Sequence, residues 1–267
     1  MKISIVSPSF NQGRFMGTCL ASVRAQKGDF KVEHIILDNC STDETAAELA
    51  RYQADPGDVE VTVIIEPDKG QTDAINRGYF MASGDIVCWL NTDEWYHEGA
   101  LARVAGYFAE HPEVDFLFGN CDFVDAEGNL VKRKREYFYS QSMLLYYGCF
   151  IPSCASFIRR RVIDEGVLLD PEFRVVMDFD WYLRIARAGY RFAHLPDMLA
   201  SFTWHETNIS VNNADRRIFE RRLAQDRAGW VTGPKWWRSA VYFTMRYCWT
   251  AIRVMRRFYA LISGQGA

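Results

Sequence analysis

A strand-like apolar run that ends abruptly in short polar residues is the first place in this sequence where chemistry could occur. Residues 86–90 have the character of a strand, and Asn91, Thr92 and Asp93 follow directly. The carboxyl ends of buried strands are where open α/β sheets bind their ligands. A carboxylate there, beside other oxygen ligands, suits Mg²⁺ or Mn²⁺, and such a cation suits a diphosphate. The alternative is a turn in which Asn91 and Asp93 cap the next helix.

Two further carboxylates stand at a predicted helix start. Asp178 and Asp180 lie two positions apart in the segment 177–182. One carboxylate there is an ordinary partner of the helix dipole, whereas two beside bulky aromatic residues indicate that at least one faces a cleft. A carboxylate in a partly apolar cleft can act as a general base. We expect Asp180 to pair with an arginine, either Arg184 or Arg187.

Two loops near the N-terminus have residues suited to a nucleoside. The loop at 7–11 follows the first predicted strand and offers Phe10 as an apolar face for a base. Asp38 and Asn39 end the second predicted strand, where a carboxylate or amide could read a base or a ribose. The alternative is that Asp38 and Asp43 only organise the turn and the helix start.

A dense polar block and a late histidine complete the candidates. The block at 66–78 offers Lys69 as a cation for phosphate, with Asp73 at a predicted helix start and Arg77 one turn later. A structural role for this block stays open. His205 follows the last predicted strand, where a lone histidine is usually structural. Beside a metal and a diphosphate it becomes a candidate ligand or phosphate donor.

The elements that must position these residues alternate between strand and helix in the first half of the chain. Hydrophobic periodicity predicts strands at 2–7, 32–37, 59–65, 86–90 and 114–118, and helices at 15–25, 41–52, 72–82 and 99–109, with a capping box of Ser41 and Glu44. This alternation implies a largely parallel sheet. After Gly119 we expect a hairpin turn at 125–129, strands at 153–158, 191–195 and 199–204, and helices at 178–188 and 214–228.

Composition narrows the class of protein. The 267 residues are 49% hydrophobic, which allows a sizeable core, and the net charge of −3 argues against nucleic acid as a partner. Seven cysteines without a CxxC pair predict free thiols in a reducing compartment. We find no signal peptide and no uninterrupted apolar span of about twenty residues, so we expect a cytoplasmic protein.

The composition changes near the C-terminus. From Pro234 onward the chain is rich in Trp, Tyr, Phe, Arg and Lys and contains no acidic residue. An aromatic, basic segment with helical character at 234–262 is similar to an interfacial membrane helix, which predicts peripheral contact with the cytoplasmic face of a membrane. The alternative is a helix packed on the domain or on a second subunit of a homodimer.

Taken in order, these motifs resemble glycosyltransferase family 2, the inverting enzymes of the GT-A fold. The matching segments are 4–13, 37–43, 68–78, 84–85 with 89–94, and 177–180. They span about residues 1–210 and leave the tail outside. The resemblance implies that the nucleoside is contacted by Ser7, Phe10, Asp38 and Asn39, and that the ribose and phosphates are contacted by Lys69, Asp73 and Arg77. It implies a metal motif of Asn91, Thr92 and Asp93, with His205 near the metal. It also implies that Asp178 is the catalytic base.

The resemblance also sets expectations for the whole molecule. It implies a Rossmann-like, mostly parallel sheet flanked by helices in a GT-A domain at 1–230, with a nucleotide-sugar half at 1–118 and an acceptor half at 119–230. A helical tail at 231–267 would follow. The implied activity is Mn²⁺- or Mg²⁺-dependent transfer from a nucleotide sugar, most often a UDP-sugar, to a glycan or lipid-linked acceptor.

The departures from the family pattern leave a rival open. Asn91 stands where the metal motif begins with an acid, and Met177 precedes Asp178 where a glutamate is usual. These features fit a GT-A scaffold that binds a carbohydrate or a partner protein without turnover. A nucleotidyltransferase would need a glycine-rich, basic phosphate loop, and residues 7–14 supply only Gly13 and Arg14.

Overall fold

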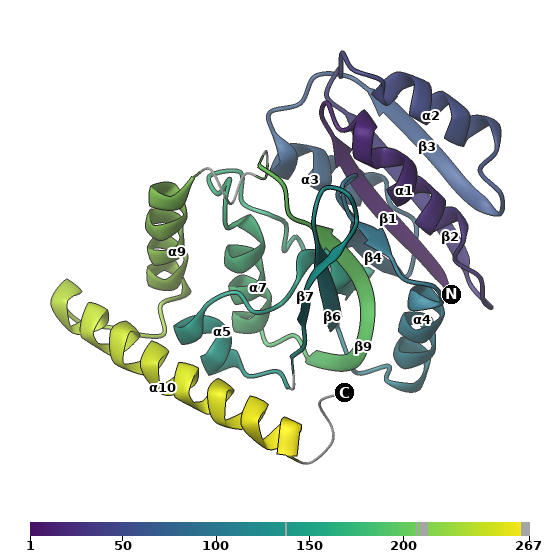
Figure 1. Ribbon diagram of the computed structural model, residues 1–267. Helices are drawn as coiled ribbons and strands as arrows, with labels where there is room; N and C mark the ends of the chain where they lie inside the picture. The colour runs from purple at the N-terminus through teal and green to yellow at the C-terminus, as the bar shows by residue number, and fades with distance from the viewer. Residues whose placement is uncertain (137, 207, 209–212, 263–267) are drawn as a thin grey trace.

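A nine-stranded sheet forms the centre of the computed structural model, which describes residues 1–136, 138–206, 208 and 213–262 (Figure 1). The strands are β1 Lys2–Ser9, β2 Lys31–Asp38, β3 Val59–Ile65, β4 Ile86–Trp89, β5 Trp95–Tyr96, β6 Phe116–Val124, β7 Leu130–Lys134, β8 Ser156–Arg159 and β9 Phe192–Thr203. The helices are α1 Gly13–Arg24, α2 Thr45–Ala54, α3 Gln71–Met81, α4 Ala100–Glu110, α5 Gln141–Tyr147, α6 Arg160–Asp164, α7 Met177–Arg187, α9 Ala214–Ala228 and α10 Lys235–Ile262, with a 3₁₀ turn at Ser153–Ala155.

The sheet is parallel where the sequence predicts it and mixed beyond that point. The strand order is β3-β2-β1-β4-β8-β6-β9-β5, and β7 pairs with β6. The first four strands in this order are all parallel, as is the long β6–β9 ladder. The ladders of β4 and β6 with β8 are antiparallel, and so are β5 with β9 and β6 with β7. Most paired residues therefore lie in parallel ladders, as expected.

Helices cover both faces of the central strands, because successive side chains of a strand point to opposite faces. Ile86 and Cys88 of β4 pack with α1 and α4 on one face, and Val87 and Trp89 pack with α3 and α7 on the other. Helix α3 lies especially close to the sheet. A Cβ at Gly78 would come within 2.3 Å of Val6, so this position requires a glycine.

The strand and helix assignments of the first half are confirmed, with shifts of a few residues at their ends. The expected capping box at Ser41 is wrong, because α2 begins at Thr45 and Ser41 bonds to Asp38 instead. The two strands expected at 191–195 and 199–204 are one strand, β9. The hairpin at 125–129 and the helix at 214–228 are as predicted.

The second half contains elements that periodicity did not indicate. The helices α5 and α6 and the two-residue strand β5 were not expected, and the first part of the predicted strand 153–158 is a 3₁₀ turn. The predicted division at residue 118 falls inside β6, so one sheet continues across it. The division into a domain at 1–230 and a tail at 231–267 stays a prediction.

The C-terminal segment is a long helix, as the sequence indicates. Helix α10 runs along the edge of the molecule beside α5 and α9, away from α1 and α2 (Figure 1). Among the described helices, none combines the length and the apolar character needed to cross a membrane. Residues 263–267 of the predicted tail lie outside the described residues.

Candidate active site

The loops that follow β1, β2 and β4 meet the start of α7 and the end of β9 around one pocket of about 620 Å³. Seven of the predicted site residues line it: Phe10, Asn39, Asn91, Thr92, Asp93, Asp178 and His205. They come from both predicted halves of the domain. The carboxyl ends of neighbouring parallel strands thus carry the predicted chemistry, as open α/β sheets do generally.

Asp93 and His205 form the polar centre of one wall. Nε2 of His205 lies 2.8 Å from Oδ2 of Asp93, and both side chains are largely buried. The ring of Phe15, on α1, stacks on His205 with 4.7 Å between centroids. The pairing of β5 with β9 brings the two residues together, and the hydroxyl of Thr203 donates to the backbone carbonyl of Asp93. Asn208 accepts a hydrogen bond from the backbone N–H of His205 at 2.7 Å.

The turn that carries Asp93 is held by its neighbours. Nε2 of Gln71 donates to Oδ1 of Asn91 at 2.7 Å, which fixes the amide oxygen at the pocket wall. The backbone N–H of Asn91 donates to Glu94 at 3.0 Å. Burial, and then the charge of Asp93, raise the pKa of Glu94 well above its usual range, so Glu94 is favoured in its neutral form. Glu94 therefore supports the turn from behind and does not line the pocket.

This donor set fits a divalent cation only with help from a ligand. Among the described residues, no group of three or more His, Cys, Asp or Glu side chains is arranged to hold a metal ion. Asp93 and His205 provide two donors, and the oxygen of Asn91 lies on the same wall. Mg²⁺ is commonly bound through one or two carboxylates together with substrate phosphates and water. The residues therefore fit a metal whose remaining ligands come from a bound diphosphate.

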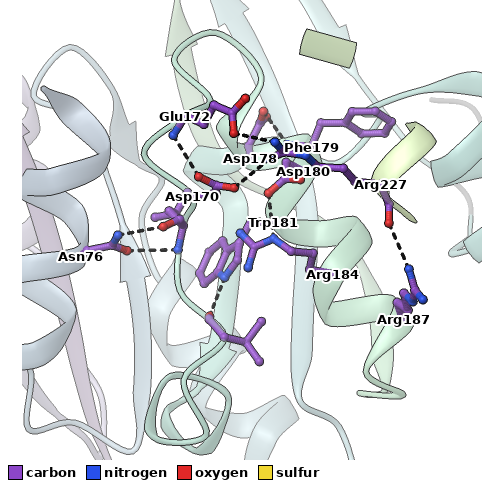
Figure 2. Close-up of polar contacts among 12 residues, drawn as sticks. Asn76, Asp170, Glu172, Asp178, Phe179, Asp180, Trp181, Arg184, Arg187 and Arg227 are labelled. Carbon is purple, nitrogen blue, oxygen red and sulfur yellow. Dashed lines mark hydrogen bonds and ion pairs between the residues drawn. The ribbon is translucent and has the colours of Figure 1, made fainter. Parts of the chain in front are cut away.

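Asp178 lies on the first turn of α7 (Figure 2) and lines the pocket together with Asp93 and His205. Oδ1 accepts the backbone N–H of Phe179 at 2.7 Å, and the thiol of Cys149 lies 3.5 Å from Oδ2. Burial raises the pKa of Asp178, although these hydrogen bonds act in the opposite direction. A carboxylate with a raised pKa is a stronger base than an exposed one.

Asp180 has a different environment from its neighbour. It is buried, and Oδ2 pairs with Nε of Arg184 at 2.8 Å (Figure 2). The expectation of an arginine partner is confirmed, with Arg184 rather than Arg187 in that place. Because Asp180 is outside the pocket wall, Asp178 is the carboxylate of this pair that faces the cavity.

A buried carboxylate on α9 holds the segment that leads into α7. Glu220 accepts the backbone N–H groups of Arg174, Val175 and Val176 at 2.8–3.1 Å. Its other partner is Arg216, at 2.5 Å on the same helix. Glu220 therefore fixes the backbone immediately before Asp178 without touching the pocket.

The first two loops are tied to each other. The backbone N–H of Asn11 donates to Ser41 at 2.7 Å, and Oδ1 of Asn11 accepts the N–H of Thr42 at 2.9 Å. Asn11 adopts a φ of 51°, which asparagine tolerates better than most residues. At Gly13 a Cβ would lie 2.6 Å from the backbone of Thr45, so a glycine is needed where α1 meets α2.

Ser7 and Asp38, two of the predicted nucleoside contacts, are not among the residues that line the pocket. Ser7 is fully buried, and its hydroxyl donates to the carbonyl of Leu90 at 2.6 Å while Nε2 of His34 lies 2.9 Å away. Burial lowers the pKa of His34 to about 3, so the ring is neutral. Asp38 is also buried, and both its oxygens bond to Ser41. Both side chains serve the fold and lie outside the pocket wall.

The predicted ribose and phosphate contacts lie to one side of the pocket. Lys69 and Asp73 line a second hollow of about 330 Å³, which shares Gln71 and Arg174 with the first. Arg77 lines neither hollow, because its guanidinium forms an ion pair with Glu66. The structure thus places Arg77 outside both hollows and Lys69 and Asp73 beside the main cavity, and their contacts to ribose and phosphates stay predictions.

Sequence reasoning missed several residues of the pocket. Among the described lining residues, Arg174 alone carries a permanent positive charge. Its position four residues before Asp178 was the feature of the sequence that could have identified it as a site residue. Four polar atoms of lining residues are buried and have no hydrogen-bond partner among the described residues: Ser9 Oγ, Gln12 Oε1, Trp89 Nε1 and Thr92 Oγ1. Since buried polar groups are normally paired, this wall is suited to a polar ligand.

Comparison with known sequences gives one family. The family model described as Glycosyl transferase family 2 matches residues 4–168. A PGL/p-HBAD biosynthesis glycosyltransferase of Mycobacterium tuberculosis is 34% identical over 119 residues, covering 44% of this chain and 45% of the relative. An uncharacterized glycosyltransferase of Nostoc sp. is 27% identical over 180 residues, covering 64% and 55%. The chain spans about half the length of the curated relatives that it matches.

Solved structures show the same architecture. TarS of S. aureus, residues 1-349 in complex with UDP-GlcNAc, superposes with a TM-score of 0.65 at 19% identity, covering 79% of this chain and 61% of that one. A mannosyltransferase of Pyrobaculum calidifontis, in complex with GDP-Man and Mn²⁺, gives 0.67 at 18% identity, covering 92% and 69%. These likenesses confirm the predicted GT-A fold.

Proposed function

The chain belongs to glycosyltransferase family 2, and on that premise we propose that it transfers a sugar from a nucleotide-sugar donor to an acceptor hydroxyl, with inversion at the anomeric carbon. One observation carries the proposal: Asp93, His205 and Asp178 line the same pocket as Phe10. A carboxylate suited to a metal–diphosphate and a second carboxylate suited to a proton are the two groups that such a transfer needs.

The donor is a nucleoside diphosphate sugar in this proposal. Phe10 is 57% exposed and offers a face to a base, and Asn39 lies beside it on the pocket wall. The two similar structures carry UDP-GlcNAc and GDP-Man, so both uridine and guanosine donors deserve a test. We propose a UDP-sugar as the donor, in line with the resemblance in the sequence.

Asp93 and His205 would hold Mn²⁺ or Mg²⁺ together with diphosphate oxygens and water. A divalent cation bound there supplies Lewis-acid stabilisation of charge on the leaving diphosphate. The chain's own part is orientation. Phe15 stacks on the ring of His205, Nδ2 of Asn208 lies 3.3 Å from Nε2 of that ring, and Gln71 fixes the amide of Asn91.

Asp178 takes the proton of the acceptor hydroxyl at a carboxylate oxygen. As that proton leaves, the acceptor oxygen bonds to the anomeric carbon from the face opposite the diphosphate. The bond from that carbon to the diphosphate oxygen breaks, and the nucleoside diphosphate departs with the electron pair. Oδ1 accepts the backbone N–H of Phe179, and Oδ2 has only the weak thiol donor of Cys149, so Oδ2 keeps a lone pair for this proton. A general base of this kind contributes roughly 10²–10⁴-fold in rate.

The acceptor hydroxyl must reach Asp178 within the same pocket. Ser153 and Arg174 also line it, and Arg174 brings a positive charge. We propose a glycan or a lipid-linked glycan as the acceptor, in polysaccharide or glycoconjugate biosynthesis.

A cytoplasmic location stays a prediction, in keeping with seven cysteines that are all free.

Two substitutions test the proposal by separating donor binding from transfer. Asp178→Asn should leave the Mn²⁺-dependent affinity for UDP nearly unchanged and reduce transfer by about 10²-fold or more. Asp93→Ala should weaken binding of the metal and of UDP together. Calorimetric titration measures the affinities, and release of nucleoside diphosphate from a panel of UDP- and GDP-sugars measures turnover.

Asp180→Asn is the matched control for the base, since it neutralises the neighbouring carboxylate outside the pocket. It should retain transfer. Transfer at the wild-type rate by Asp178→Asn would refute the assignment of the base. A panel in which the wild-type chain binds sugar nucleotides but neither hydrolyses nor transfers them would instead favour a binding scaffold.

A further inference from the structure

Helix α10 packs on the domain through one face. Tyr242 is buried, and its hydroxyl donates to the carbonyl of Gln225 on α9 at 2.8 Å. Arg253 pairs with the buried Glu136 at 2.5 Å and lies 4.6 Å from the ring centroid of Tyr147 on α5. These contacts fix the orientation of the helix about its own axis.

The opposite face of α10 exposes a second apolar stripe. Trp236, Phe243, Tyr247 and Val254 follow one another at intervals of seven, four and seven residues, which places them on one side of a helix. Each has between 56% and 71% of its surface exposed. Tyr259 is likewise exposed, at 69%. Contiguous exposed apolar side chains of this kind mark interaction surfaces.

The charges around this stripe have one sign. Helix α10 contains no acidic residue. Arg238 and Arg253 are neutralised by Asp226 and Glu136 of the domain, on the packed face. Lys235 and Arg246 are exposed and form no ion pair with any described residue. Lys235 lies seven residues before Tyr242, and Arg246 seven before Arg253, so both basic residues flank the aromatic stripe on the side toward the domain and leave uncompensated positive charge beside it.

We propose that α10 docks the protein on an anionic lipid surface, with the stripe of Trp236, Phe243, Tyr247 and Val254 inserted among the headgroups and Lys235 and Arg246 facing lipid phosphates. Helices that lie in a bilayer interface have this composition, with Trp or Phe on one face and Lys or Arg beside it. Trp and Tyr are also the residues enriched at the membrane–water boundary. The proposal is independent of sugar transfer.

Charge selects a lipid surface over a second copy of the chain. Two chains packed through this stripe would bring only basic charge to the edge of the contact, because α10 has no carboxylate to pair with its lysine and arginine side chains. Anionic headgroups supply that missing charge. Each basic residue near an anionic membrane surface contributes an attraction that raises the affinity for the membrane about fivefold.

The test is co-sedimentation of the full chain with vesicles of phosphatidylcholine, with and without phosphatidylglycerol. We expect binding to the vesicles that contain phosphatidylglycerol, weakened by salt because exposed charges are screened. Replacing Phe243 and Tyr247 by Ser should reduce the affinity at least about tenfold, because two buried aromatic side chains are lost. Replacing Lys235 and Arg246 by Gln should reduce it about fivefold for each charge.

Matched controls remove the same number of apolar side chains or of positive charges from surfaces outside α10. Phe80→Ser with Val131→Ser removes two exposed apolar side chains, and Lys27→Gln with Arg51→Gln removes two exposed charges. Both controls should bind as the wild type does. The positions substituted in α10 are exposed, so unfolding temperatures should stay unchanged.

Two results would overturn the proposal. One is a wild-type chain that fails to sediment with phosphatidylglycerol vesicles, or that binds equally well after the α10 substitutions. The other is a dimer, seen by analytical ultracentrifugation without lipid, that Phe243→Ser with Tyr247→Ser dissociates. That result would assign the stripe to a second copy.

Discussion

Two carboxylates on one helical turn have different tasks because their side chains leave the helix in different directions. Asp178 faces the pocket and is held by Phe179 and Cys149, whereas Asp180 turns into the protein and pairs with Arg184. Sequence spacing allowed this division, since residues two apart on a helix do not share a face. A base needs spare acceptor capacity at the cavity, and Asp178 has it.

The half-buried position of Asp178 predicts a cost in stability that depends on pH. Its pKa is raised in the folded protein, so the unfolded chain loses this proton first as pH rises above about 3.9. Above both pKa values the fold holds a half-buried charge that Asn would not carry. Asp178→Asn should therefore match the wild type in stability at low pH and exceed it at neutral pH.

Urea unfolding followed from roughly pH 4 to pH 8 measures this difference, a range that starts near the ordinary pKa of the carboxyl. Asp215→Asn is a suitable control, because it removes an exposed carboxylate at the start of α9. A stability difference that stays constant across this range would contradict the raised pKa. A wild type that becomes the more stable protein at neutral pH would contradict its sign.

At this scale the sequence predicted residue types better than side-chain partners. Phe10, Asn91 and Asp93 could be placed at the pocket because short polar or exposed residues directly follow buried strands. Ser7 and Asp38 also end strands, yet each bonds within the fold. Whether such a residue faces the pocket or bonds within the fold depends on partners that are distant in sequence, such as Leu90 for Ser7. The local sequence pattern carries no information about these partners.

Helix α9 shows how an element without a site residue positions the base. Its Glu220 takes three successive backbone N–H groups just before α7, much as a capping residue satisfies the first donors of a helix. The Glu220 side chain is buried, so it meets these donors inside the protein, where an unpaired N–H group is costly. The entry of the chain into α7 is therefore set by a residue more than 40 positions away.

Glu220→Gln should destabilise the protein by about 1–3 kcal/mol, because an amide leaves part of this set of buried donors unpaired. Burial alone would raise the pKa of Glu220, but hydrogen bonds from Arg216 and the backbone outweigh it and lower the pKa. The stabilisation is thus present above the unfolded pKa of about 4.3 and lost as pH falls through the folded value.

The difference in stability between Glu220→Gln and the wild type should therefore become smaller as the pH is lowered. Urea unfolding at several pH values measures it. The turnover number should also fall, because the backbone before Asp178 is released, while UDP affinity stays close to that of the wild type. An unchanged turnover number together with lowered stability would show that Glu220 supports the fold without positioning the base.

Longer elements with a distinct pattern or end could be predicted, and short ones could not. Strand 59–65 alternates valine with polar residues, and helix 214–228 is a run without proline or glycine that ends at Gly229, and both match the structure residue for residue. Helices α5 and α6 are only seven and five residues long, too short for a period to be recognised. Strand β5 exists only because β9 pairs with it, a contact remote in sequence.

At the scale of the molecule, the two predicted halves form one structure. Strand β6 begins before the expected division at residue 118 and pairs with β8 and β9 beyond it. One hydrophobic cluster contains residues of β1, β2, α3, α5 and α7. The pocket likewise takes Asp93 from the first half and Asp178 and His205 from the second. The sequence indicated both halves but not their shared core, since that core consists of contacts between distant residues.

A shared core and a shared pocket predict one cooperative unfolding transition that a ligand shifts as a whole. UDP with Mn²⁺ at about 100 times its dissociation constant should stabilise the native state by about 2.7 kcal/mol. For a chain of this size each kcal/mol raises the midpoint by about 2–4 °C, so scanning calorimetry should show a single peak moved upward by several degrees. Asp93→Ala should keep the single peak and lose the shift, because it removes the carboxylate expected at the metal without touching the sheet. Two peaks, of which UDP with Mn²⁺ moves only one, would show that the halves unfold separately and that the ligand binds within one of them.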